Sequence, residues 1–350
     1  MSETVEVGAP AAAAGRAADG SLVALDDVSK RFVRPLDLAE KIGNLLGAGR
    51  RAEVVHAVDR ASLSIRRGEV LALVGESGCG KSTLGRVAVG LLPPTSGERY
   101  WKDEPLSGMT QAQRRKLQLR MQMIFQDPYA ALNPRMRVVD IVGQAPLVHG
   151  MISARQQVEY VGLQLNRVGL DPTLMRRFPH QFSGGQRARI GIARALSVKP
   201  EFLVCDESVA ALDVSIQAQV LNLFMDLRQA LELTYLFISH DLGVVQHISD
   251  RVLIMYLGRI VESGPTLDLF GSPNHPYTQA LLAAIGRVEP GKRTFVPVHG
   301  EIPSPLNPPS GCHFHPRCPH ALPRCSVVAP PLVEVAPGRR SACWLNEAAA

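Results

Sequence analysis

The residues most suited to chemistry form a glycine-rich run that ends in a lysine and a serine. Gly75-Glu76-Ser77-Gly78-Cys79-Gly80-Lys81-Ser82, continued by Thr83, has the spacing of a phosphate-binding loop. It follows an apolar strand pattern and precedes a helical one, which is the context that such a loop requires. Glycines let successive backbone N–H groups point at phosphate oxygens, Lys81 adds a positive charge, and Ser82 offers a hydroxyl to Mg²⁺. The run therefore predicts a binding site for a nucleoside triphosphate.

A second acidic motif is suited to act on the same ligand. The apolar segment Phe202-Leu203-Val204-Cys205 is followed directly by Asp206 and Glu207. Two acids after a strand are, taken alone, more often a solvated strand end. Paired with a phosphate loop, Asp206 is expected to hold Mg²⁺ through water, and Glu207 to polarise the attacking water as a general base.

The bulk properties limit the classes of protein that this chain can be. It has 350 residues, of which 46% are hydrophobic, and a net charge of +6 that suits an anionic ligand or a membrane surface without indicating nucleic acid. No apolar run approaches the roughly 18 residues of a membrane span. Residues 1–7 lack the basic start of a signal peptide. We therefore expect a cytoplasmic protein whose six cysteines do not form disulfides.

The elements that must position these residues follow an alternating pattern. Short apolar runs recur between helical segments, which indicates an α/β domain with a largely parallel, buried sheet. The runs are Glu69 to Val74, Met121 to Phe125, Glu201 to Cys205, Tyr235 to Ile238 and Arg251 to Met255. Ile216, Val220, Leu223, Leu227 and Leu231 recur at helical spacing and predict one helix from Val214 to Leu231.

Other segments have their own character. Residues 1–20 are rich in Ala and Gly and are expected to be a disordered leader. Residues 34–53 are predicted to be an exposed insertion, and residues 135–182, which hold only helical pattern, a helical subdomain inserted into the α/β core. The Pro- and Cys-rich tail is predicted to be a separate small extension.

One further motif resembles a known family. Phe182-Ser183-Gly184-Gly185-Gln186 is similar to the signature motif of ATP-binding-cassette (ABC) ATPases, which usually begins with Leu. Ser and Gly at a helix start also form an anion site without any lysine. The resemblance, which covers residues 22–265, implies that this motif contacts the ATP of a partner subunit, so that two subunits enclose two nucleotides.

The same resemblance assigns roles to four other positions. It implies that Gln126 senses Mg²⁺ and the attacking water, that Asp213 of Ala211-Leu212-Asp213 belongs to a dimer-contact loop, and that His240 contacts the γ-phosphate. Phe32 best matches the aromatic residue that stacks on adenine, although core packing explains it equally well. Ser208 departs from the family, which usually has Pro after the catalytic Glu; this bears on the rigidity of the turn and not on the chemistry.

The branch of the family is indicated by longer motifs. Four segments resemble those of dipeptide and oligopeptide importer ATPases. They are Phe125-Gln126-Asp127-Pro128-Tyr129, Leu132-Asn133-Pro134-Arg135, His275-Pro276-Tyr277-Thr278 and Gly300-Glu301-Ile302-Pro303-Ser304-Pro305. The branch also includes nickel and glutathione importers, which stay as alternatives. A non-transport ABC ATPase is disfavoured, because coiled coils, zinc modules and a second cassette are absent. A module that binds ATP without hydrolysing it is disfavoured by Glu207 and His240, and an exporter ATPase by the tail.

This branch implies partners and a place in the cell. The insertion at residues 34–53 and the Cys79 variant resemble the second of two non-identical ATPases, so a heterodimer is expected. Two transmembrane permease subunits, and indirectly an extracellular substrate-binding protein, complete such importers. A groove near residues 126–136 is the expected docking site of a permease helix. The protein would be peripheral on the cytoplasmic face of the inner membrane.

The tail also holds four cysteines in a segment with little core. Cys312, Cys318, Cys325 and Cys343 are separated by five, six and seventeen residues, which is not the spacing of a zinc ribbon. Resemblance to the peptide importers implies a 4Fe-4S cluster held by all four. Zinc, with His313, His315 and His320 as substitute ligands, and free thiols remain alternatives.

The prediction as a whole is an α/β phosphate-loop ABC ATPase domain at residues 21–265, with a helical subdomain at residues 135–182, and a Cys/Pro-rich extension at residues 266–350. It uses ATP and Mg²⁺. ATP binding closes the dimer, and hydrolysis reopens it and drives alternating access of the permease.

Overall fold

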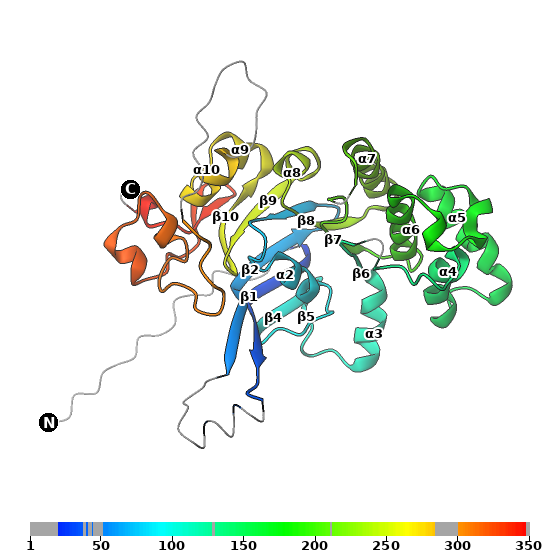
Figure 1. The fold of residues 1–350 in the computed structure, drawn as a ribbon, viewed down its shortest axis with the longest axis horizontal. Coiled ribbons are helices and arrows are strands. Elements are labelled where there is room, and N and C mark those ends of the chain that lie inside the picture. Colours follow the sequence, from blue (N-terminus) through cyan, green and yellow to red (C-terminus); the bar gives the residue numbers. More distant parts are fainter. Residues whose placement is uncertain are drawn as a thin grey trace, which may run out of the picture.

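A computed structural model describes residues 20–37, 40, 44, 52–127, 130–210, 212–283 and 300–347. Its described strands form two sheets, one of eight strands and one of four. Figure 1 shows the larger sheet at the centre of the molecule, with a helical region on one side and the C-terminal segment on the other. The predicted leader, apart from Gly20, lies outside the described residues, as does most of the predicted insertion at residues 34–53.

The larger sheet has a parallel centre and an antiparallel edge. Its strands are β3 (Val70–Val74), β6 (Met121–Ile124), β7 (Phe202–Asp206), β8 (Thr234–Ser239), β9 (Arg251–Tyr256), β10 (Arg259–Pro265), β11 (Val333–Ala336) and β12 (Arg339–Ser341). The order is β11-β12-β10-β9-β3-β8-β7-β6. Neighbouring strands from β9 to β6 are parallel, and every residue of β3, β7 and β8 is buried. The α/β fold and its five predicted strands are confirmed, with ends that shift by at most one residue.

Helices cover both faces of this sheet, as buried parallel strands require. The helices of the described chain are α2 (Lys81–Ala88), α3 (Gln111–Arg120), α4 (Val138–Val148), α5 (Gln157–Arg167), α6 (Gly184–Leu196), α7 (Val214–Leu231), α8 (Leu242–Ile248), α9 (Thr266–Gly271) and α10 (Pro276–Ala283). The predicted bounds of α7 are confirmed. Its apolar stripe is confirmed at Val220, Leu223 and Leu227, whereas Leu231 in the last turn is 36% exposed, because the stripe leaves the core before the helix ends.

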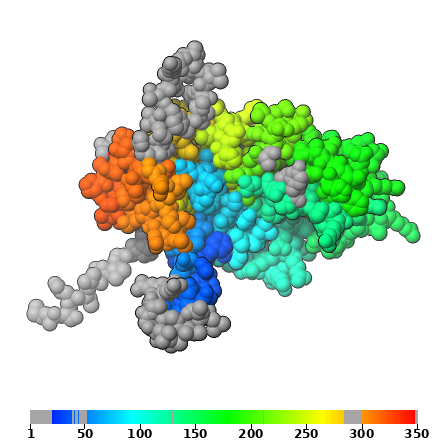
Figure 2. Space-filling view, in the orientation of Figure 1, coloured from blue at the N-terminus to red at the C-terminus, as the bar shows by residue number. Residues whose placement is uncertain are grey.

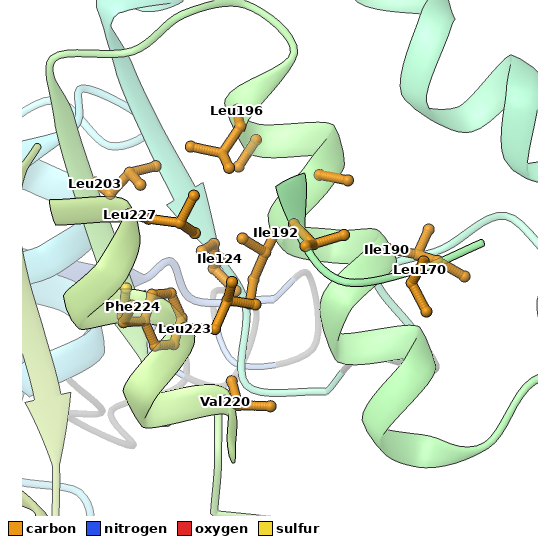
Figure 3. Packing of buried hydrophobic residues seen from close by; sticks show 14 of the residues in the cluster. Ile124, Leu170, Ile190, Ile192, Leu196, Leu203, Val220, Leu223, Phe224 and Leu227 are labelled. Carbon is orange, nitrogen blue, oxygen red and sulfur yellow. The ribbon is translucent and has the colours of Figure 1, made fainter. Parts of the chain in front are cut away.

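The helical region is held to the sheet by one apolar core. In Figure 3, side chains of α6 and α7 gather over β6 and β7, among them Ile192, Leu196, Leu223, Phe224 and Leu227. The same core continues into α4 and α5 through Ile141, Val161 and Leu165. Between residues 135 and 182 the described chain contains helices and turns and no strand, as the pattern predicts.

The smaller sheet was not predicted from the apolar runs of the sequence. Its antiparallel strands are β1 (Ser21–Arg34), β2 (Glu53–Arg66), β4 (Ser96–Trp101) and β5 (Glu104–Pro105), in the order β2-β1-β4-β5. The outer ends of β1 and β2 pair through Arg34 and Glu53, so the segment between them starts and ends at the tip of a long two-stranded ribbon. The aromatic Phe32 lies on this ribbon, opposite Val55.

The C-terminal segment is joined to the main sheet. Strand β12 pairs with β10 through Glu262 and Ser341, and β11 pairs with β12, so this hairpin extends the sheet at its edge. In Figures 1 and 2 the described part of the segment, orange to red, packs against the domain on the side away from the helical region. The predicted boundary at residue 265 stays a prediction, although α9 does begin at Thr266. In the part of the chain that the structure describes, no helix has the length and apolar character to cross a membrane.

Candidate nucleotide-binding site

The predicted phosphate loop connects β3 to α2, and its shape depends on glycine. Gly78 and Gly80 have φ of 79° and 106°, in the left-handed region that side chains rarely adopt. A Cβ on Gly80 would also collide with the backbone oxygen of Ala57. The buried Lys81 Nζ donates hydrogen bonds to the backbone oxygens of Gly75 (2.8 Å) and Glu76 (3.0 Å). The loop is therefore closed around its own lysine, at the N-terminal end of α2.

Two carboxylates from the end of β7 lie beside this loop. The Ser82 hydroxyl donates to Asp206 Oδ1 at 2.8 Å, and burial raises the pKa of Asp206, an effect that the Ser82 hydrogen bond opposes. Glu207 lies between two polar side chains. Gln126 Nε2 donates to Glu207 Oε2 at 2.7 Å, and His240 Nδ1 lies 3.3 Å from Glu207 Oε1. Gln126, Asp206, Glu207 and His240, from the ends of the three neighbouring strands β6, β7 and β8, thus meet the phosphate loop at one edge of the sheet.

The turn at Glu207 is fixed by the backbone and does not need the proline that the family usually has there. Glu207 has a positive φ of 43°. Its N–H donates to the oxygen of Ile238 at 3.0 Å, and its own oxygen accepts from the N–H of Ala210 at 3.1 Å. Ser208 is buried in the following position. The backbone at Glu207 is consequently anchored to β8 and closed by Ala210 within its own turn, with Ser208 in the place of the proline.

Lys81, Ser82, Gln126 and Glu207 line one cavity of about 330 Å³, within the size range of small-molecule sites, while Asp206 and His240 lie behind its wall. Its lining is Phe32, Val55, Ala57, Ser77, Gly78, Gly80, Lys81, Ser82, Thr83, Gln126, Glu207 and Pro305. The phosphate loop forms one end and Phe32 another part of the wall. Phe32 is 40% exposed, so core packing does not account for it, and Lys30 Nζ lies 5.3 Å from the centre of its ring. The cavity therefore offers an aromatic face as well as a phosphate site.

Other predicted residues do not line this cavity. Ser183 is the exposed N-cap of α6: its hydroxyl accepts from Gln186 N, and the Gln186 side chain accepts from Ser183 N. Gly184 and Gly185 form the first turn of α6 and face Leu212 and Ile216. Asp213 is the exposed residue at the N-cap position of α7 and makes no side-chain capping hydrogen bond, while Ala211 lies outside the described residues. The signature motif is thus presented outwards and is absent from the lining of this chain's own cavity.

Some residues of the cavity had not been predicted. Val55 and Ala57 come from β2, and Pro305 comes from the C-terminal segment, 224 residues after Lys81. Gly300-Glu301-Ile302-Pro303-Ser304-Pro305 stood out in the sequence only as a motif of the tail. No spacing rule places such a distant segment at the mouth of a phosphate loop, because the contact arises from long-range packing.

The four tail cysteines approach one another. Burial, with smaller contributions from the charges of Cys325, Cys343 and Cys318, raises the pKa of Cys312 to about 11. Cys312 N also donates to the oxygen of Cys325 at 2.8 Å, and none of the four forms a disulfide. However, within the described ranges no group of three or more His, Cys, Asp or Glu residues is arranged to hold a metal ion. His313 instead places Nδ1 at 2.9 Å from the backbone oxygen of Leu257.

Comparisons with known proteins agree with this geometry. Residues 58–210 match the family described as ABC transporter, and residues 261–325 match the family described as oligopeptide/dipeptide transporter, C-terminal region. The probable peptide ABC transporter ATP-binding protein y4tS of Sinorhizobium fredii is 50% identical over 298 residues, which is 85% of this chain and 84% of that protein. The oligopeptide transport ATP-binding protein AppF of Bacillus subtilis is 47% identical, over 93% of this chain and 97% of that protein.

Solved structures match the same part of the chain. CbiO1 of Clostridium perfringens, part of an ABC transporter complex, superposes with a TM-score of 0.59 at 25% identity, over 72% of this chain and 92% of that one. The cassette MJ0796, solved as a dimer with ADP and phosphate, shares the fold with a TM-score of 0.58 at 24% identity, over 70% of this chain and 98% of that one. By sequence and by fold, the chain belongs to the ABC transporter ATP-binding proteins, in the branch that carries the oligopeptide/dipeptide transporter C-terminal region.

Proposed function

We propose that this chain is the ATP-binding and ATP-hydrolysing subunit of a membrane importer of peptides. The observation that carries the proposal is the position of Glu207, whose carboxylate lies between Gln126 and His240 at the cavity that the phosphate loop lines. A general base needs to be within hydrogen-bonding reach of a water beside the γ-phosphate, and this arrangement supplies it. The peptide assignment is supported by the relatives, which are named as peptide and oligopeptide transport ATP-binding proteins, and by the matched C-terminal region.

In this proposal the residues of the cavity divide the nucleotide between them. Phe32 stacks on the adenine, while the N–H groups of residues 75–83 and the ammonium of Lys81 hold the phosphates. Hydroxyl and carboxylate oxygens suit Mg²⁺, and the 2.8 Å contact between Ser82 and Asp206 brings such oxygens together. Ser82, Gln126 and, through water, Asp206 would hold the ion, which neutralises phosphate charge when bound.

Hydrolysis follows from the remaining contacts. Glu207 takes a proton from the attacking water, His240 positions the γ-phosphate, and Gln126 orients the water and Glu207 together. The backbone hydrogen bonds around residue 207 keep the carboxylate in place without a proline. The outward-facing Ser183 and Gly185 would complete the site of a second ATPase subunit, because backbone donors at a helix start bind phosphate.

The assembly that we propose has four core parts. This chain pairs with a second, non-identical ATPase, and the pair associates with two transmembrane permease subunits on the cytoplasmic face of the cell membrane. A permease helix would dock near residues 126–136. ATP binding closes the two ATPases and hydrolysis separates them, which switches the permease between its two orientations.

The experiment that tests this function is uptake of labelled dipeptides and oligopeptides by cells that lack the gene. Uptake should return with the wild-type chain and fail to return with Glu207→Gln. Unchanged uptake in all three strains would contradict peptide import by this chain, and the same cells would then be tested with nickel and glutathione.

We also propose that Cys312, Cys318, Cys325 and Cys343 hold a 4Fe-4S cluster. The mutual influence of the thiols on their pKa values supports it, and four thiolates are the ordinary ligands of such a cluster. Against it, the described side chains are not in ligating positions, and burial raises the pKa of Cys312, Cys318 and Cys343, which disfavours their thiolate forms. Iron and zinc analysis of anaerobically purified wild type and Cys318→Ser decides the matter: four irons per chain support the cluster, one zinc supports the alternative, and absence of both metals indicates free thiols.

A further inference from the structure

The C-terminal segment reaches the phosphate loop through a two-point ion pair. Arg317 lies in the short 3-10 helix η4 (His315–Arg317), and its Nη1 and Nη2 atoms donate to the two carboxylate oxygens of Glu76 at 2.8 and 3.0 Å. The Arg317 side chain is 5% exposed and the Glu76 side chain 23%. Glu76 is the second residue of the phosphate loop. Such a bidentate, largely buried pair is among the strongest and most orientation-dependent contacts that two side chains can make.

The same loop residue is held by a second contact from beyond β10. The backbone N–H of Glu76 donates to the hydroxyl of Tyr277 in α10 at 3.0 Å. Tyr277 packs against Tyr256 and Phe314, with ring centres 4.6 and 5.4 Å away. Both the side chain and the backbone of Glu76 are therefore positioned by groups that follow the cassette in the sequence.

A third contact lies at the other end of the cavity. Pro305 lines the cavity together with Phe32, and its oxygen accepts a hydrogen bond from His56 N on β2 at 3.1 Å. Figure 1 shows the orange segment that follows residue 300 passing beside β2. The C-terminal segment thus touches the cavity where Phe32 lies and also touches the phosphate loop.

We propose that the C-terminal segment is part of the nucleotide site and that Arg317 is a positioning residue, which neutralises Glu76 and so keeps the phosphate loop ready for Mg–ATP. The proposal rests on the proposed function. Its physical basis is that removal of one partner of a buried pair leaves an uncompensated charge. Here that charge would be a carboxylate within the loop that has to receive phosphates, so its repulsion would act directly on the ligand.

A merely structural role makes a different prediction. If Arg317 only helped the C-terminal segment to fold, any comparable damage to that segment would weaken nucleotide binding, and removal of Glu76 would not repair it. The chain offers a matched control in Arg324, which forms an ion pair with Glu347 at 2.6 Å and stacks over Trp344 at 3.5 Å, entirely within the C-terminal segment.

The experiment is a titration of the full-length chain with a fluorescent ATP analogue and Mg²⁺, with the melting temperature of every variant recorded. Arg317→Met is expected to raise the Kd roughly tenfold, as for loss of a charge-assisted contact. Arg317→Lys, which keeps the charge and loses the fork, should lie between that variant and wild type. Glu76→Gln combined with Arg317→Met should return the Kd to within about twofold to threefold of wild type, because no unpaired charge remains. Arg324→Met should bind as wild type does.

Three results would overturn the proposal: wild-type affinity in Arg317→Met, a double variant as weak as Arg317→Met, or an equal loss in Arg324→Met. The double variant keeps the test decisive if Arg317→Met folds poorly, because it removes both charges at once. A wild-type chain that does not bind the analogue would contradict the proposed function itself, and with it this inference. Binding by wild type with unaffected variants would overturn the inference alone.

Discussion

The two ends of this molecule differ in how completely they form a nucleotide site. At the phosphate-loop end, residues of β1, β2, the phosphate loop, the turns after β6 and β7, and the C-terminal segment converge on one cavity. At the α6 end, Ser183 and Gly184 are the cap and first turn of a helix that faces outwards. The first end is therefore testable with this chain alone, whereas in the function proposed above the second contacts the nucleotide of another subunit.

The largest effect is expected at the converged end. Glu207→Gln keeps the shape of the side chain and its contact with Gln126, and it removes the basic oxygen. Turnover of ATP should fall by roughly 100-fold or more, the usual size of a general-base contribution, while Mg–ATP binding stays within a few-fold of wild type. Steady-state phosphate release and nucleotide titration on the same preparation measure the two quantities.

The control for this variant is Glu201→Gln. Glu201 precedes β7, at its opposite end, and pairs with Lys102 and Arg120 on the surface. The Glu201→Gln variant should hydrolyse ATP at a rate near that of wild type. Hydrolysis by pure Glu207→Gln at a wild-type rate would remove Glu207 from the catalytic role.

The outward-facing end should respond only in the assembled transporter. Ser183→Ala removes a hydroxyl that we expect to contact a partner's phosphate, a bond to a charged group worth about 1.5–3 kcal/mol. Hydrolysis by the assembled complex should fall by roughly tenfold or more, while the isolated chain binds Mg–ATP as wild type does.

Loss of a helix cap would itself destabilise the chain, so this variant needs a matched partner. Thr110 caps α3 with the same reciprocal contacts, to Gln113, and is remote from the cavity. Thr110→Ala should lose similar stability, about 1 kcal/mol, and keep activity. If isolated Ser183→Ala lost affinity for Mg–ATP, the contrast between the two ends would fail.

The sequence predicts some parts of the molecule and not others. Short motifs predict the phosphate loop, Asp206 and Glu207, and apolar runs predict the parallel strands, which are buried on both faces. For these parts the local sequence pattern was enough. The four-stranded sheet was missed, because β1 and β2 are partly exposed and their pairing depends on contacts between distant segments. Arg317 and Pro305 were missed for the same reason: Arg317 lies 241 residues from Glu76, and no periodicity reports such a contact.

A smaller effect is expected at the aromatic wall of the cavity. Phe32→Ala should weaken Mg–ATP binding by roughly fivefold to tenfold, since stacking of a base on an aromatic ring is worth about 1–3 kcal/mol. Phe32→Trp should retain the affinity. Val33→Ala is the control, because Val33 is the next residue of β1, is 61% exposed and does not line the cavity. Equal affinities for Phe32→Ala and Val33→Ala would assign the adenine to another surface.

The smallest effect concerns stability in acid, to which buried histidines on the C-terminal side of the molecule should contribute and an exposed histidine on the helical side should not. His275 is buried, its Nδ1 accepts from Tyr277 N at 3.1 Å, and burial lowers its pKa to about 4. Burial likewise lowers the pKa of His313 to about 4. Unfolded histidine has a pKa of about 6.5, so the unfolded chain binds more protons between these values, and the free energy of unfolding falls as the pH drops from about 6.5 towards 4.

His275 alone should lower the free energy of unfolding by about 1.4 kcal/mol between pH 7.5 and 5.5, because the unfolded chain binds its proton over the one pH unit below the unfolded pKa. His275→Gln should lower stability at every pH, because the ring is well packed, and it should also reduce the slope with pH by that amount. Urea unfolding at the two pH values measures the slope. His149→Gln, at an exposed position after α4, should keep the wild-type slope. An undiminished slope in His275→Gln would mean that His275 takes up no proton on unfolding, and the acid sensitivity would then have to arise elsewhere in the chain.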